Sequence, residues 1–171
     1  MKNLLQTLCG LFLVVFYSSC MNSGDNRVDV LIVGGGASGV TSGIQAARMG
    51  ANTLILEETT WLGGMLTSAG VSAVDGNYRL PAGLWGEFKN RLSDYYGGLD
   101  SLKTGWVSNV LFEPSVGNRI FHEMVSAEKN LKVWKQTRLE EVKRVGDEWI
   151  AKVNVEGQGT KTVRSKVMID A

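Results

Sequence analysis

A glycine-rich stretch near the start of the chain carries the clearest chemical pattern. The short, mostly apolar run VDVLIV at residues 28–33 is followed by Gly34, Gly36 and Gly39 in the spacing G-x-G-x-x-G, and an apolar-periodic segment then begins. We predict a strand, a tight turn and the start of a helix. The first glycine permits the turn, the second lets a bound group approach bare backbone, and the third lets the helix lie close to the strand.

This arrangement predicts a site for a pyrophosphate. The first N–H groups of a helix have no intrahelical partner, and the helix dipole is positive at that end. A doubly negative group is therefore stabilised there without any lysine. We assign to the pyrophosphate the backbone of Gly34, Gly36, Ala37, Ser38 and Gly39.

An acidic residue ends the next apolar run. Residues 53–56, TLIL, predict a second strand, and Glu57 follows roughly 20 residues after Gly34, the spacing expected of a ribose-binding acid. A carboxylate at this position can accept both hydroxyl protons of an adenosine ribose and repels a 2′-phosphate, which disfavours NADP. Between the two strands, Gly43 is predicted to face the sheet and Gly50 to end the helix.

A second glycine-rich stretch follows at residues 61–71. Its paired glycines, Gly63 and Gly64, allow the main chain to pass against a flat ring system or a phosphate, and Met65 can add apolar cover. A domain that binds only a nicotinamide dinucleotide does not need this loop.

Several segments in succession resemble the N-terminal part of bacterial FAD-dependent oxidoreductases of the glutathione-reductase-like superfamily, in particular an exported group. The resemblance rests on GGGASG, LILEE and WLGGMLTSAG, and continues in GLWGEF, TGWVSN and FEPSVG. It implies an α/β fold of the Rossmann-like, FAD-binding type. In this fold an antiparallel β-meander forms a crossover connection between strands of the parallel sheet. It also implies FAD as the cofactor, a flavin-side role for Gly63, Gly64 and Met65, and an adenine-edge contact at Leu139. The complete enzyme is expected to take a hydride or electrons from a small-molecule substrate and pass them to an unknown acceptor.

The rest of the chain predicts helices first and strands later. We predict one helix at residues 84–96 that ends at the glycines 97–98, and a second helix that begins at residues 113–115. The second helix carries His122, the only histidine of the sequence, which we expect to be a polar surface or packing residue. Tyr95, Tyr96 and Trp106 are expected in the core rather than in a substrate pocket. Strands are predicted at residues 131–134, 139–145, 148–155 and 160–164, three of them as a meander, with a separate parallel-type strand at 166–171.

The N-terminus has the form of an export signal. Residues 1–20 combine a charged start, an apolar segment from Leu4 to Tyr17 and a cysteine, Cys20, after small residues, so we predict a signal peptide of the lipoprotein kind, with residues 21–27 as a tether. We expect a location in the bacterial cell envelope, in the periplasm or at the outer membrane, with lipid on Cys20. A plain secretory peptide or an uncleaved signal anchor are the alternatives.

Composition excludes several classes. Both cysteines, Cys9 and Cys20, fall in the leader, so the folded part is expected to have no disulfide, no redox-active thiol pair and no thiolate metal site, and we assign no metal. The net charge of the chain is +1, without a basic run, which makes nucleic acid a poor partner.

We expect one FAD-binding domain over residues 28–171, with a helical insertion at about residues 75–130. In the family that the chain resembles, a strand such as VMIDA is followed by a Thr-Gly-Asp type turn over the pyrophosphate, so the domain is expected to be incomplete at its C-terminus, and we assign no catalytic residue. Two alternatives stay open: an NAD-binding Rossmann protein, against which the LGGMLT loop and the meander argue, and a catalytically inactive, truncated surface protein.

Overall fold

The computed structural model describes residues 26–106 and 108–171. The predicted signal peptide, Cys20 and most of the predicted tether lie outside the described residues. The elements follow one another as β1 (Asn26–Val33), α2 (Ala37–Arg48), β2 (Thr53–Leu56), the 3-10 turn η1 (Gly64–Leu66), α3 (Gly83–Tyr96), the 3-10 turn η2 (Leu99–Leu102), α4 (Pro114–Ser126), β3 (Leu131–Trp134), β4 (Thr137–Val145), β5 (Glu148–Val155) and β6 (Gly159–Asp170).

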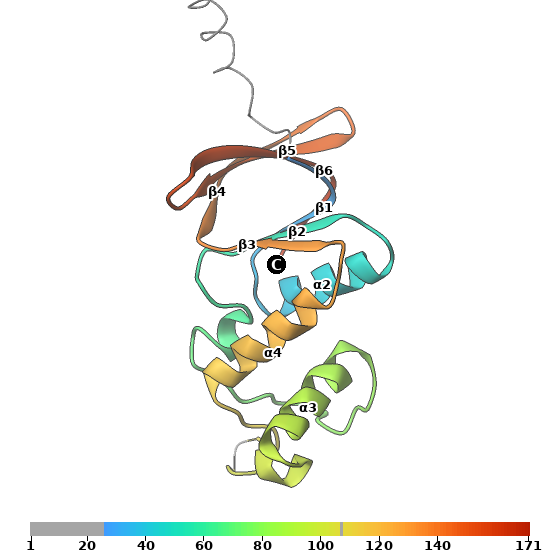
Figure 1. Ribbon diagram of the computed structural model, residues 1–171, viewed down its shortest axis with the longest axis vertical. Helices are drawn as coiled ribbons and strands as arrows, with labels where there is room; N and C mark the ends of the chain where they lie inside the picture. The colour runs from blue at the N-terminus through green and yellow to red at the C-terminus, as the bar shows by residue number, and fades with distance from the viewer. Residues whose placement is uncertain (1–25, 107) are drawn as a thin grey trace, which may run out of the picture.

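One six-stranded sheet organises the fold, in the order β3-β2-β1-β6-β5-β4 (Figure 1). Strands β3, β2, β1 and β6 are parallel, and β4 and β5 join the β6 side as antiparallel neighbours. The connection from β3 to β6 therefore runs through a β-meander. This architecture confirms the predicted α/β, Rossmann-like fold with a parallel sheet and an antiparallel meander crossover.

The last strand differs from its prediction. We expected one strand at residues 160–164 and another at 166–171, but β6 is a single strand of 12 residues. Its first half pairs with β5, and the strand pairs with β1 from Val163 to Asp170. Ser165, which lies between the two predicted strands, is buried and pairs with both β1 and β5, so the strand continues. The Lys166 ammonium donates to the Asp29 carboxylate at 2.7 Å.

Helices α2 and α4 cover one face of the parallel strands, and α3 lies beyond α4 (Figure 1). Small residues let α2 approach the sheet: a Cβ added at Gly43 would lie 2.7 Å from the Cδ1 atom of Ile55. Val40 and Ile44, one turn apart on the same helix, are fully buried. Gly50 follows the helix with a φ of 91°, so the predicted small face and glycine stop are both confirmed.

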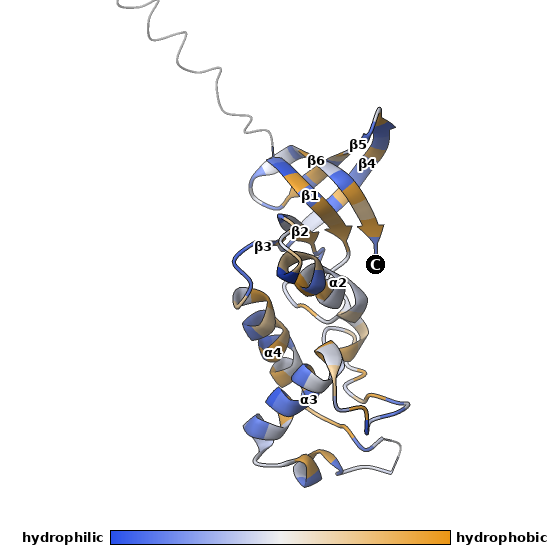
Figure 2. Ribbon diagram, turned by 90° about the vertical axis from the view of Figure 1, so that its right-hand side faces the viewer, coloured by the Kyte–Doolittle hydropathy of each residue, from blue (hydrophilic) through white to orange (hydrophobic). Residues whose placement is uncertain are grey.

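The meander curls over the opposite face of the sheet. The N–H of Thr137, at the start of β4, donates to the carbonyl of Glu57, just after β2, at 2.9 Å. Figure 2 shows apolar residues gathered along β1 and the carboxyl-terminal part of β6. A second core fills the space between the curled strands, made of Val28, Leu31, Leu54, Leu56, Ala151, Val153, Val155 and Val163.

Aromatic packing joins α3 to α4. The rings of Phe88 and Phe121 stack with centroids 4.5 Å apart, and Phe112 meets Phe88 edge-on at 5.5 Å. The expectation of aromatic core residues was wrong for Trp106, whose side chain is 96% exposed, and for Tyr95, which is also exposed.

Candidate cofactor-binding site

The glycine turn after β1 is closely packed. Gly34 has a φ of 105°, and a Cβ on it would lie 2.1 Å from the carbonyl oxygen of Ala171, at the end of β6. A Cβ on Gly39 would lie 1.9 Å from the Gly34 carbonyl oxygen. Both distances are far shorter than a van der Waals contact. The first turn of α2 is therefore held directly against the end of β1, as the spacing of the glycines predicts.

Gly36, between these two positions, faces open space. Its backbone is extended, with φ −63° and ψ −179°, and the nearest atom to an added Cβ is the Ser38 hydroxyl oxygen at 4.0 Å. No side chain caps α2, and its first turn contains no acidic residue. The structure thus combines an uncapped helix N-terminus with a bare backbone and a first helical turn free of acidic residues, which fits the approach of a diphosphate.

Glu57 is held in place by the backbone on both sides of it. Its Oε2 accepts the N–H of Gly35 at 2.8 Å, and its Oε1 accepts the N–H of Thr59 at 2.7 Å. Its side chain is buried, with 8% exposed. Each carboxylate oxygen can accept a further hydrogen bond, so a sugar hydroxyl can still bind. This bridge between the glycine turn and the loop after β2 could not be predicted from the spacing of the residues.

The two glycine-rich stretches meet in space. The N–H of Gly63 donates to the carbonyl of Gly35 at 2.8 Å, and Gly36 and Gly63 form an isolated parallel bridge. A Cβ added at Gly64 would lie 3.0 Å from the Cα of Gly36. Met65 follows with 70% of its side chain exposed. The structure therefore brings the predicted flavin-side residues next to the N-terminus of α2.

Residues of α4 that the sequence analysis did not single out support this loop. The Oδ1 of Asn118 accepts the N–H of Leu62 at 2.9 Å. The ring of Phe121 lies under Gly63, 2.6 Å from the position of an added Cβ. Gly117, one residue before Asn118, was a usable signal, because a glycine inside an apolar helix marks a close approach by another segment.

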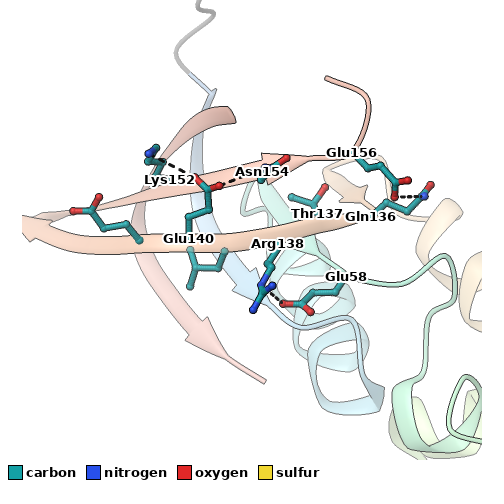
Figure 3. A pocket seen from close by; sticks show the side chains of 10 residues that line it. Glu58, Gln136, Thr137, Arg138, Glu140, Lys152, Asn154 and Glu156 are labelled. Carbon is teal, nitrogen blue, oxygen red and sulfur yellow. Dashed lines mark hydrogen bonds and ion pairs between the residues drawn. The ribbon is translucent and has the colours of Figure 1, made fainter. Parts of the chain in front are cut away.

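The predicted adenine-edge residue is among those that line a hollow of about 840 Å³ on the solvent-exposed face of β4 and β5, the face opposite to the buried Ala151, Val153 and Val155 (Figure 3). Leu139 shares this hollow with Glu58 and Arg138, whose charged groups lie 3.9 Å apart. Because Glu58 directly follows Glu57, the hollow adjoins the predicted ribose position. Further along the hollow, Lys152 and Asn154 lie within reach of the Glu140 carboxylate.

His122 is half-buried on α4, and this burial, with a smaller effect from Lys135, lowers its pKa below 6.5. Its position agrees with the expected packing role. In the described part of the chain, no three His, Cys, Asp or Glu residues come close enough together to hold a metal ion. Nor does any described helix have the length and apolar character needed to cross a membrane.

These features together define a class of protein. A glycine turn at a helix N-terminus, an acid at the end of the second strand and a meander crossover together define a Rossmann-like dinucleotide-binding domain. A second glycine loop lies against the turn, where the family resemblance implies the flavin side of the cofactor.

The chain belongs to the FAD dependent oxidoreductase family, whose sequence model matches residues 29–171. FAD is therefore its cofactor. None of the curated proteins compared with the sequence matches it significantly.

Solved structures share the fold at low sequence identity. A flavoprotein/dehydrogenase from Cytophaga hutchinsonii aligns with a TM-score of 0.61 at 13% identity, over 85% of this chain and 39% of that one. The p-nitrophenol 4-monooxygenase PnpA from Pseudomonas putida gives 0.55 at 14% identity, over 85% and 41%. The anhydrotetracycline hydroxylase OxyS from Streptomyces rimosus gives 0.60 at 13%, over 85% and 31%. The chain thus spans about two-fifths or less of the length of these proteins.

Proposed function

We propose that residues 28–171 form the flavin-binding portion of an FAD-dependent oxidoreductase of the glutathione-reductase-like superfamily. One observation carries this proposal: the loop with Gly63 and Gly64 hydrogen-bonds to the glycine turn at the N-terminus of α2. Two stretches of bare backbone, residues 34–39 and 63–64, thereby form one cradle.

Each part of the cofactor then has a proposed position. The diphosphate lies against the backbone of residues 34–39, and Glu57 accepts the ribose hydroxyls with the lone pairs that Gly35 and Thr59 leave available. The hollow beside Leu139 receives the adenine, and Met65 covers the flavin side. When bound, FAD supplies the two-electron chemistry, and the chain binds and orients it.

The substrate and the electron acceptor lie on the flavin side in this proposal. We propose a small-molecule substrate that gives up a hydride or two electrons. No catalytic side chain is assigned, because the flavin-side residues named above are glycines and a methionine, which neither donate nor accept a proton.

We also propose that the protein is exported to the bacterial cell envelope and held at the membrane by lipid on Cys20. The support is the sequence of residues 1–20 alone. Labelling cells with a radioactive fatty acid tests the anchor: the wild-type chain is expected to be labelled and the Cys20→Ala variant unlabelled. Equal labelling of both would overturn it.

Titration of the full chain with FAD, FMN and NAD tests the cofactor assignment. Because the proposed contacts fall on the adenosine and diphosphate, FAD should bind, ADP should compete with it, and FMN, which lacks adenosine, should bind at least about tenfold more weakly. Flavin fluorescence reports FAD and FMN, and displacement reports ADP and NAD. Equal affinity for FAD and FMN, or tighter binding of NAD than of FAD, would contradict the proposal.

A further inference from the structure

A second hollow lies in the helical part of the molecule, beside the middle of α3 and η2. Its volume is about 250 Å³, and it is lined by residues of the segments 78–79 and 99–110 and by Lys89 of α3. This region lies beyond α4 from the sheet (Figure 1). None of its lining residues belongs to the cofactor site.

Lys89 brings a buried positive charge to this hollow. Only 7% of the residue is exposed, and its Nζ donates to the carbonyl oxygens of Tyr78 at 2.7 Å and Leu80 at 2.9 Å. It also lies 5.8 Å from the centre of the Trp85 ring. All three partners are neutral, and no carboxylate pairs with Lys89 among the residues that the structure describes. An ammonium group has three donors, and a buried charge is most stable beside an opposite one.

Two further cations line the same hollow. The Arg79 guanidinium donates to the hydroxyl of Tyr78 at 3.3 Å, again a neutral partner. Lys103 pairs with Asp100 at 2.8 Å, but the Asp100 side chain is 96% exposed, and such surface pairs contribute little. The lining itself contains three cations and no acidic residue.

Apolar side chains complete the wall. Val110, which is 2% exposed, and the side chains of Leu99 and Tyr78 face the same space. A ligand that satisfies both the cations and these apolar groups must combine an anionic group with a compact apolar body.

We propose that this hollow binds a small organic carboxylate whose apolar body packs on Leu99 and Val110 while its carboxylate meets Arg79, Lys89 and Lys103. The site is separate from the cofactor cradle and does not depend on the flavin assignment.

Benzoate is the probe for this proposal. The full chain, with and without excess FAD, is titrated with benzoate at constant ionic strength, and binding is followed by amide chemical shifts. Benzyl alcohol, which lacks the charge, and inorganic phosphate, which lacks the apolar body, are titrated in parallel. We expect benzoate to bind at least about tenfold more tightly than either, with equal affinity in the presence of FAD.

Variants locate the binding. Lys89→Met removes the charge and retains an apolar stem, and Arg79→Gln changes an exposed residue whose guanidinium donates to the neighbouring Tyr78 hydroxyl. Each should weaken benzoate binding by about tenfold, whereas Lys143→Gln, on exposed β4, should leave it unchanged. If Lys89→Met does not fold, the affinity of Arg79→Gln for benzoate alone tests the proposal. Unchanged binding in Arg79→Gln, benzoate no tighter than benzyl alcohol or phosphate, or displacement by FAD would each overturn the proposal.

Discussion

Alanine at Gly36 should separate cofactor binding from folding. An added Cβ at this residue meets no atom closer than 4.0 Å, and its φ of −63° and ψ of −179° suit alanine. Alanine is a poorer N-cap than glycine by about 0.5–1 kcal/mol, but it lowers the entropy of the unfolded chain by a similar amount, about 0.4–1 kcal/mol. The free energy of unfolding of the FAD-free chain should therefore change by less than about 0.5 kcal/mol.

Binding of FAD should respond quite differently. The new methyl group projects from the backbone that we assign to the diphosphate and would hold a phosphate oxygen away from the N–H groups of α2. A charge-assisted hydrogen bond contributes about 1.5–3 kcal/mol, so the dissociation constant should rise by about 10- to 150-fold.

Gly39→Ala is the matched comparison, because its Cβ would lie 1.9 Å from the Gly34 carbonyl oxygen. Overpacking of this kind costs about 1–3 kcal/mol, so this variant should lose stability even without cofactor. Urea unfolding measures stability and flavin fluorescence measures affinity. The reasoning is refuted if Gly36→Ala binds FAD within twofold of wild type, or if it destabilises the FAD-free chain as much as Gly39→Ala does.

Three further predictions concern α4. Burial lowers the pKa of His122, so near pH 6.5 and below the unfolded chain binds a proton more readily than the folded chain does. The free energy of unfolding should therefore fall as the pH drops from 7.5 to 5.5. Urea titrations should show a smaller dependence on pH in His122→Asn. Phe121→Ala should lower that free energy by about 3–5 kcal/mol, because the ring is 2% exposed and stacks on Phe88, and thermal unfolding followed by circular dichroism would show the loss. Asn118→Ala should cost about 1–3 kcal/mol and weaken FAD binding, because it leaves the N–H of Leu62 without its acceptor.

Each of these has an outcome that counts against it. A pH slope that persists in His122→Asn belongs to another group. A loss below about 1 kcal/mol in Phe121→Ala would mean that the ring does not join α3 to α4. Unchanged flavin affinity in Asn118→Ala would show that the glycine loop keeps its position without α4.

The sequence predicted those parts of the fold that local rules govern. The strand at residues 53–56 ends where the apolar run ends, and Gly50 and Gly97 stop their helices with positive φ, as expected of C-terminal glycines. The spacing of Gly34 and Gly39 likewise implied the close contact between α2 and β1. Each of these features depends on residues near one another in the chain.

Features that depend on contacts between residues far apart in the sequence could not be predicted by these local rules. The single strand β6 needs β1 on one side and β5 on the other, and Ser165 in its middle pairs with Val28 of β1 and Trp149 of β5. The support of the glycine loop by Asn118 joins residues 56 positions apart. Likewise, Glu57 had an evident ligand role in the sequence, whereas its hydrogen bond to the Gly35 N–H is visible only in three dimensions.

A crystal structure of the full chain grown with excess FAD tests the central claim most directly. We predict diphosphate oxygens within hydrogen-bonding distance of the backbone N–H groups at residues 36–39, and a ribose hydroxyl on Glu57. A diphosphate bound elsewhere, or a Glu57 carboxylate that contacts only Gly35 and Thr59, would contradict the account.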